Sequence, residues 1–214
     1  MDIAIPIFDR FTALDAVGPY EVLSRLPGAR VRFVAHDARP VRAATRMLTL
    51  VAEARLEDVP APEVLVVPGG IGTRALIGDA RMLDWIRGAH ETSTWTTSVC
   101  TGSLLLAAAG VLDGIDAATH WNAFAELGVL GVRPTARRVV EHGKVITAAG
   151  VSAGIDMALT LAARIAGDDV ARAIQLELEY DPQPPFDAGS PEAAGEAIVA
   201  LARTVTAVER GVAD

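Results

Sequence analysis

Short apolar runs rich in β-forming residues alternate with helix-like segments along the whole of this 214-residue chain. Such an alternation favours parallel strands joined by helical crossovers, with helices on both faces of the sheet. We therefore predict an α/β fold with a doubly wound, mostly parallel sheet. The expected strands are 2–8, 31–36, 64–68, 94–99 and 145–149, with weaker candidates at 47–51, 116–120 and 137–141, and the expected helices are 15–26, 80–91, 101–109, 122–127, 152–166, 168–181 and 193–210.

One Pro-rich segment interrupts this alternation, at residues 181–190, just before the last expected helix. Too few residues follow it to build a second hydrophobic core. We therefore predict a single domain over residues 1–214 that ends in a helix at about 193–210.

The charge balance narrows the possible partners. The formal net charge is -8 and no basic cluster is present, which argues against a nucleic-acid surface. No apolar run is long enough to span a bilayer, and no basic N-terminal region precedes an apolar stretch, so we expect no membrane partner.

The cysteine and histidine content points to a metal-free protein in a reducing compartment. Cys100 is the only cysteine, which excludes an internal disulfide and fits a cytoplasmic location. We expect no metal site, because the four histidines show no recognisable metal-ligand spacing: His36, His90, His120 and His142.

Cys100 lies between the β-rich run 94–99 and the helix-forming residues 102–109, with almost nothing separating the two elements. A side chain on such a sharp strand-to-helix turn is exposed at the top of the sheet, as in a nucleophile elbow. The helix N-terminus would also lower the thiol pKa. The alternative is a small buried apolar residue, the usual role of a free cysteine. We favour the nucleophile.

Asp15 follows the first expected strand, and ligands of open α/β sheets bind at the carboxyl ends of strands. Helix N-capping is the common role of aspartate in this position. However, we expect the first strand and the elbow strand to lie side by side, as they often do in doubly wound sheets. Asp15 would then lie against Cys100 with a raised pKa and act as a general acid.

Two further segments offer site residues. The amides of Gly70 and Thr101 could form an oxyanion-type donor pair, although glycines after a strand can simply permit a tight turn. His120 could serve as a base for Cys100. We expect it to be a packed, hydrogen-bonded residue instead.

Several motifs together form a recognisable pattern. They are Leu14–Asp15–x–x–Gly18–Pro19, Pro68–Gly69–Gly70, Thr97–Ser–Val–Cys100–Thr–Gly–Ser103, Thr119–His–Trp121, Gly150–x–x–Ala153–Gly154–Ile155–Asp156 and the segment from Gln175 to Pro191. This pattern resembles the PfpI-type branch of the class I glutamine amidotransferase-like superfamily over roughly residues 2–191, and within that branch the isocyanide hydratases.

The resemblance implies a flavodoxin-like fold, a homodimer and a nucleophilic cysteine, Cys100, with the acid Asp15 beside it. Thr101 matches the position after the nucleophile, whose backbone amide and hydroxyl contribute to the site, and Gly70 matches the glycine that supplies a second amide. The implied reaction converts a small apolar isocyanide and water to an N-substituted formamide through a cysteine-bound thioimidate, without a metal or organic cofactor. The remaining expected substrate-binding residues are Ile71, Trp121, Val151 and Phe186.

Other activities remain open for the same cysteine. Thr101 stands where protease and amidotransferase branches carry a histidine, which disfavours a peptidase. A glyoxalase or an amidase is the first alternative. A non-enzymatic redox-sensing or ligand-sensing domain is the second, because exposed thiols of low pKa oxidise readily.

Overall fold

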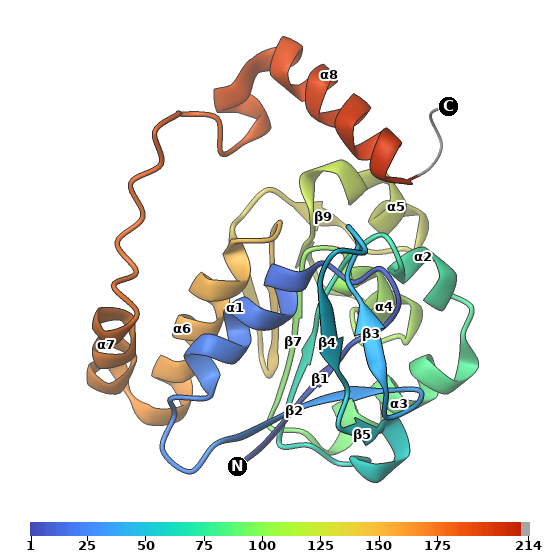
Figure 1. Ribbon diagram of the computed structural model, residues 1–214, viewed down its shortest axis with the longest axis vertical. Helices are drawn as coiled ribbons and strands as arrows, with labels where there is room; N and C mark the ends of the chain where they lie inside the picture. The colour runs from blue at the N-terminus through green and yellow to red at the C-terminus, as the bar shows by residue number, and fades with distance from the viewer. Residues whose placement is uncertain (211–214) are drawn as a thin grey trace. The chain divides into compact units, whose positions relative to one another are not determined.

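The computed structural model describes residues 1–210, with side chains through residue 205 (Figure 1). The chain divides into two compact units, Met1–Leu178 and a second one that begins at Glu179. The second unit contains the predicted last helix, α8 (Pro191–Arg210), which is interrupted by a non-helical conformation at Gly195. The single domain expected from the sequence stays a prediction.

A seven-stranded sheet forms the centre of the first unit, in the order β10-β11-β7-β6-β1-β2-β5. All neighbouring strands are parallel except β10, which is antiparallel to β11. This arrangement confirms the predicted α/β class with its mostly parallel sheet. The strands are β1 (Asp2–Pro6), β2 (Arg30–Ala35), β5 (Ala54–Arg55), β6 (Val64–Val67), β7 (Trp95–Val99), β10 (Val139–His142) and β11 (Val145–Ala148).

Two short pairs lie outside the main sheet. An antiparallel hairpin joins β3 (Pro40–Arg42) to β4 (Thr49–Val51), and β8 (Ala117–Ala118) pairs in parallel with β9 (Pro134–Thr135). The sequence does not predict β3, β5 or β9, because two or three residues are too few to show the alternation of apolar and polar side chains that marks a strand.

Helices cover both faces of the sheet. In Figure 1, α1 (Ala13–Leu23), α6 (Ala153–Ala166) and α7 (Asp168–Glu177) lie on one side. The other side carries α2 (Thr73–Leu76), α3 (Ala80–Thr92), α4 (Gly102–Ala108) and α5 (Phe124–Val129), with the 3-10 turns η1 (Leu56–Asp58) and η2 (Trp121–Ala123) in the connections. No helix among residues 1–210 combines the length and apolarity that a membrane span needs.

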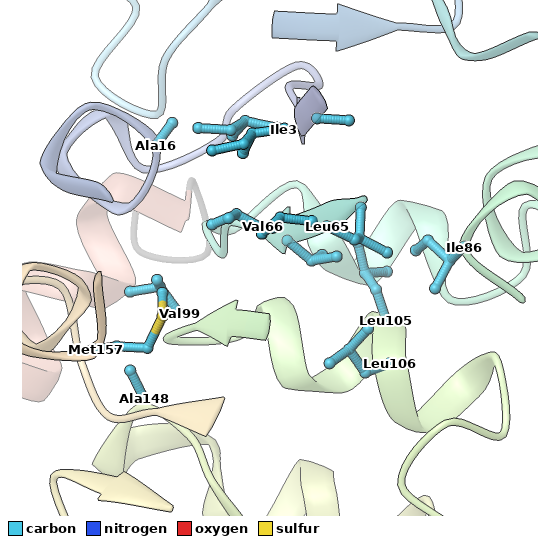
Figure 2. Packing of buried hydrophobic residues seen from close by; sticks show 14 of the residues in the cluster. Ile3, Ala16, Leu65, Val66, Ile86, Val99, Leu105, Leu106, Ala148 and Met157 are labelled. Carbon is cyan, nitrogen blue, oxygen red and sulfur yellow. The ribbon is translucent and has the colours of Figure 1, made fainter. Parts of the chain in front are cut away.

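The core has two layers, one on each face of the strands. Figure 2 shows Ala16 and Met157 on one side and Ile86, Leu105 and Leu106 on the other. All five side chains are fully buried. Burying a side chain of leucine or isoleucine size contributes about 1.5–3 kcal/mol, so two buried faces explain why the strand sequences are apolar throughout.

One sequence expectation about the sheet is wrong. β1 and the elbow strand β7 are not neighbours, because β6 lies between them and pairs with both. A residue following β1 must therefore reach across the end of β6 to contact the residue following β7.

Candidate active site

The site lies at the carboxyl ends of four consecutive strands in the sheet, β1, β6, β7 and β11. The segments that follow these strands carry Asp15, the Pro68–Gly72 turn, Cys100 and Val151, respectively. The structure thus brings together four of the loops that the sequence analysis singled out.

Cys100 occupies a strained elbow between β7 and α4. Its φ is 57°, in the left-handed region that residues with a side chain rarely adopt. Its amide donates to Ala148 O at 3.1 Å and Ala149 O at 2.9 Å, which holds the turn against β11. Gly102 is needed next, because a Cβ there would lie 2.1 Å from Val67 O. The predicted elbow is therefore present, but the prediction that its side chain is exposed is wrong, because Cys100 is buried.

Asp15 is the third residue of α1 and does not cap the helix. Thr12 is the N-cap residue, so the capping role considered for Asp15 is wrong. The Asp15 side chain is fully buried, and its Oδ2 accepts a hydrogen bond from the Gly69 amide at 2.9 Å. Its Oδ1 is also buried and accepts no hydrogen bond from an N–H or O–H group of the described residues, while the Cys100 thiol lies close enough to interact with the carboxyl.

Gly69 explains how Asp15 reaches the elbow across β6. A Cβ on Gly69 would lie 2.5 Å from Thr101 N and 2.9 Å from Asp15 Oδ2. The missing side chain therefore lets α1 and the elbow approach each other over the end of β6. The Thr12 amide also donates to Gly69 O at 2.9 Å, which fixes the start of α1 on this turn.

Burial raises the pKa values of both Asp15 and Cys100. The Asp15 pKa rises to about 7, and the hydrogen bonds with the Gly69 amide and with Cys100 act in the opposite direction. The pKa of the Cys100 thiol rises because the sulfur is buried and because the Asp15 carboxylate lies close to it, while the amides of Thr101 and Val151 lower it less.

These shifts decide two predictions. The rise in the Asp15 pKa is confirmed, whereas a thiol pKa lowered by the helix N-terminus is wrong, because desolvation outweighs the amides. Above a pH of about 7, Asp15 and Cys100 hold one proton between them. Asp15 and Cys100 thus make a proton-sharing pair.

The predicted oxyanion pair of Gly70 and Thr101 amides is not formed. The Gly70 amide donates to Thr101 Oγ1 at 2.9 Å, and the Thr101 amide acts on the Cys100 sulfur. The amides that act on the reactive groups come from Thr101, Val151 and Gly69, of which Gly69 was missed. Gly69 has no side chain to signal a role, and only its neighbour Gly70 drew attention to the turn.

His120 has a packed environment. Its Nδ1 accepts from the Asn122 amide at 3.2 Å, and a Cβ on Gly150 would lie 2.7 Å from its ring. The Trp121 ring lies 5.5 Å from the His120 ring. The His120 ring therefore lies against the segment that leads to Val151.

The other expected binding residues are placed as follows. Ile71 and Trp121 are half-buried, at the turn after β6 and at the start of η2. Val151 has a φ of 30° and its amide acts on the Cys100 sulfur. Phe186 belongs to the second unit, so its place in the pocket stays a prediction. Within the described residues, no group of three or more His, Cys, Asp or Glu side chains could hold a metal ion.

The site combines a buried cysteine on a strained elbow with a carboxyl at the carboxyl ends of parallel strands. These features are those of α/β proteins whose site is built around a cysteine. A family comparison identifies which of these proteins the chain resembles. Residues 1–164 match the DJ-1/PfpI family, and the chain belongs to it.

The similarity to known proteins covers most of the chain. An isonitrile hydratase from Pseudomonas putida is 45% identical over 203 residues, which cover 95% of this chain and 89% of the relative. A crystal structure of a THiJ/PfpI family protein from Pseudomonas syringae has a TM-score of 0.92 and 36% identity, over 100% of this chain and 89% of that one. The solved structure of oxidized Toxoplasma gondii DJ-1 shares the fold, with a TM-score of 0.74 and 20% identity over 84% of this chain and 98% of that one. These comparisons confirm the predicted family, the flavodoxin-like fold and the prediction of an enzyme.

Proposed function

We propose that this protein is an isonitrile hydratase that converts an isocyanide and water to an N-substituted formamide. One observation carries the proposal: the fully buried Asp15 carboxyl, held by the Gly69 amide, lies close to the Cys100 thiol on the elbow. Burial raises the pKa of that carboxyl to about 7. The extent of similarity to the Pseudomonas putida isonitrile hydratase supports the same reaction.

The first step needs a nucleophile and a proton donor together. The terminal carbon of an isocyanide, R–N≡C, gains a nucleophile and a proton when it reacts. In the singly protonated pair, Asp15 takes the thiol proton, the Cys100 sulfur bonds to that carbon, and Asp15 delivers the proton to the same carbon. The product is a thioimidate, R–N=CH–S–Cys100, and Asp15 is left ionised.

The second step adds water to the thioimidate carbon. The Asp15 carboxylate accepts a proton from the water and passes it to the substrate nitrogen, while the Thr101 hydroxyl donates a hydrogen bond that holds the water oxygen. The resulting R–NH–CH(OH)–S–Cys100 then collapses. The C–S bond breaks, the hydroxyl proton returns to the pair, and the formamide R–NH–CHO leaves.

A turnover assay tests the proposal. The protein is incubated with cyclohexyl isocyanide, and the N-cyclohexylformamide formed is quantified. The wild-type chain is expected to turn over, while Cys100→Ala is inactive and Asp15→Asn loses at least about a hundredfold in rate, the lower range for general acid–base catalysis. Wild-type turnover no greater than that of Cys100→Ala would remove the assignment.

The same samples distinguish the alternative functions. Glycolate formed from glyoxal, without any formamide, would assign a glyoxalase. Reversible oxidation of Cys100 without turnover of either substrate would assign a sensor. A homodimer and a cytoplasmic location belong to the proposal as well, and light scattering on the purified protein tests the dimer.

A further inference from the structure

The Cys100 carbonyl belongs to the same peptide group as the Thr101 amide that acts on the sulfur, and the hydration mechanism gives this carbonyl no role. We propose that Thr119 is a positioning residue, whose hydroxyl holds the Cys100–Thr101 peptide so that the Thr101 amide stays directed at the Cys100 sulfur. The inference deepens the proposed function and rests on it for one consequence, a sulfur ready to attack the isocyanide.

Two side-chain hydroxyls donate to Cys100 O. Ser103 Oγ lies 3.1 Å from this oxygen and Thr119 Oγ1 lies 3.2 Å from it. Ser103 is in the turn that follows the elbow, whereas Thr119 is 19 residues away in the chain and comes directly after β8. Among the described residues no backbone amide donates to this carbonyl, so the two hydroxyls satisfy it.

The planarity of the peptide group links this carbonyl to the sulfur. The Cys100–Thr101 peptide is trans, so its C=O and its N–H point in opposite directions and turn together. Donors that hold Cys100 O therefore also fix the direction of the Thr101 amide, which acts on the sulfur. The elbow needs such support, because a φ of 57° at Cys100 is strained and persists only where neighbouring groups hold it.

Thr119 is itself held in place from the neighbouring strand β11. The amide of the preceding residue, Ala118, donates to Thr147 Oγ1 at 2.8 Å, and Thr147 lies on β11. Thr119 is only 1% exposed, so its hydroxyl has no water as an alternative partner to Cys100 O. The hydroxyl is thus a fixed donor to the elbow from a distant part of the chain.

Removal of the Thr119 hydroxyl should leave the sulfur less able to ionise. In Thr119→Val, Cys100 O keeps only the donor from Ser103, and the peptide can turn away from the sulfur. The Thr101 amide then stabilises the thiolate less. A loosened fold would instead expose the sulfur and make it react faster, so the sign of the change separates positioning from loss of structure.

Oxidation of Cys100 by hydrogen peroxide measures the thiolate without any isocyanide. The thiolate bonds to one peroxide oxygen, the O–O bond breaks, and a sulfenic acid and hydroxide form. Mass spectrometry of the Cys100 peptide follows the reaction of the full chain at a pH of about 8, where Asp15 and Cys100 hold one proton. We expect the rate constant of Thr119→Val to be about fivefold below that of the wild type, within the range for one hydrogen bond.

Three further variants complete the set. Thr119→Ser keeps a hydroxyl and should stay within about twofold of the wild type. Thr97→Val is the matched control and should react at the wild-type rate, because Thr97 Oγ1 is also a buried donor to a backbone carbonyl, Leu65 O at 3.1 Å, but not to the elbow. Ser103→Ala removes the other donor to Cys100 O and should slow oxidation as Thr119→Val does.

The same variants are assayed with cyclohexyl isocyanide, and kcat/KM of Thr119→Val is expected to fall about fivefold as well. Unchanged or faster oxidation of Thr119→Val, or an equal loss in Thr97→Val, would overturn the inference and leave the hydratase assignment untouched. If Thr119→Val does not fold, Ser103→Ala decides in the same way. Slower oxidation of Thr119→Val, with no isocyanide turnover in the wild type, would support the positioning role and remove the hydratase function.

Discussion

Asp15 and Cys100 both lose hydration on folding, and the neighbouring groups compensate only part of that loss. One amide, from Gly69, donates to the carboxyl, while the amides of Thr101 and Val151 act on the sulfur. Each group is easier to ionise when the other is neutral. The single proton of the pair therefore suits the first step, in which it moves from the Cys100 sulfur to the Asp15 carboxyl and on to the substrate. Its departure leaves Asp15 ionised and able to accept a proton from water in the second step.

Asp15 should make folding stability depend on pH. Its pKa is about 7 in the folded protein against an ordinary value of 3.8, so the folded state holds the proton more tightly. Its contribution to stability is present below a pH of about 4 and is lost as the pH rises through about 7. The Asp15→Asn variant should therefore gain stability relative to the wild type as the pH rises, by roughly 4 kcal/mol in total.

Urea unfolding of both proteins at several pH values from about 4 to 8 measures this difference. Chemical denaturation at each pH gives the free energy of unfolding directly. A difference between the two proteins that stays constant over this range would contradict the raised Asp15 pKa.

The same pKa should appear in the kinetics. Below a pH of about 7 both groups are protonated, and no proton acceptor is available to the thiol. The value of kcat/KM for an isocyanide is therefore expected to rise about tenfold per pH unit below 7 and to level off above it. A profile that is flat from about pH 5 to 8 would show that the pair does not lose a proton to become active.

The elbow depends on close packing between α4 and the end of β6. A Cβ at Gly102 would lie 2.1 Å from Val67 O, a backbone atom that cannot move away without shifting the strand. We expect Gly102→Ala to destabilise the fold by about 3 kcal/mol, at the upper end for overpacked sites.

Gly78→Ala provides the control for Gly102→Ala. No heavy atom lies within 4 Å of a Cβ placed on Gly78, so this variant should change the free energy of unfolding by less than about 1 kcal/mol. Thermal unfolding of both variants measures the contrast. Equal Tm values would mean that α4 can shift away from β6 at little cost.

Considered as a whole, the chain joins a first unit containing the full sheet to a second unit that begins at Glu179. Residues 181–189 are all exposed, and Phe186 in this segment is 78% exposed. Limited digestion with chymotrypsin is therefore expected to cut first after Phe186.

The large fragment left by that cut should still unfold cooperatively, because it retains all of the main sheet and its core. Mass spectrometry identifies the cut, and circular dichroism follows the unfolding of the product. A fragment that loses its cooperative transition would favour the single domain predicted from the sequence.

The amino-acid sequence was sufficient to predict the α/β class, most of the helices and strands, and the elbow at Cys100. These features are local: a run of β-formers, a helical period and a glycine after a turn each act over a few residues. The relevance of Asp15 was also predictable, because carboxyl ends of parallel strands meet at one edge of a sheet.

Folding alone decided which of these residues act on one another. The strand order put β6 between β1 and β7, and Gly69 became the residue over which Asp15 reaches the elbow. The tertiary structure also turned the Gly70 amide toward the Thr101 hydroxyl. It buried the Cys100 thiol, so the pKa of that thiol is raised and not lowered as predicted. Burial and hydrogen-bond partners depend on segments far apart in the chain, and no local pattern specifies them.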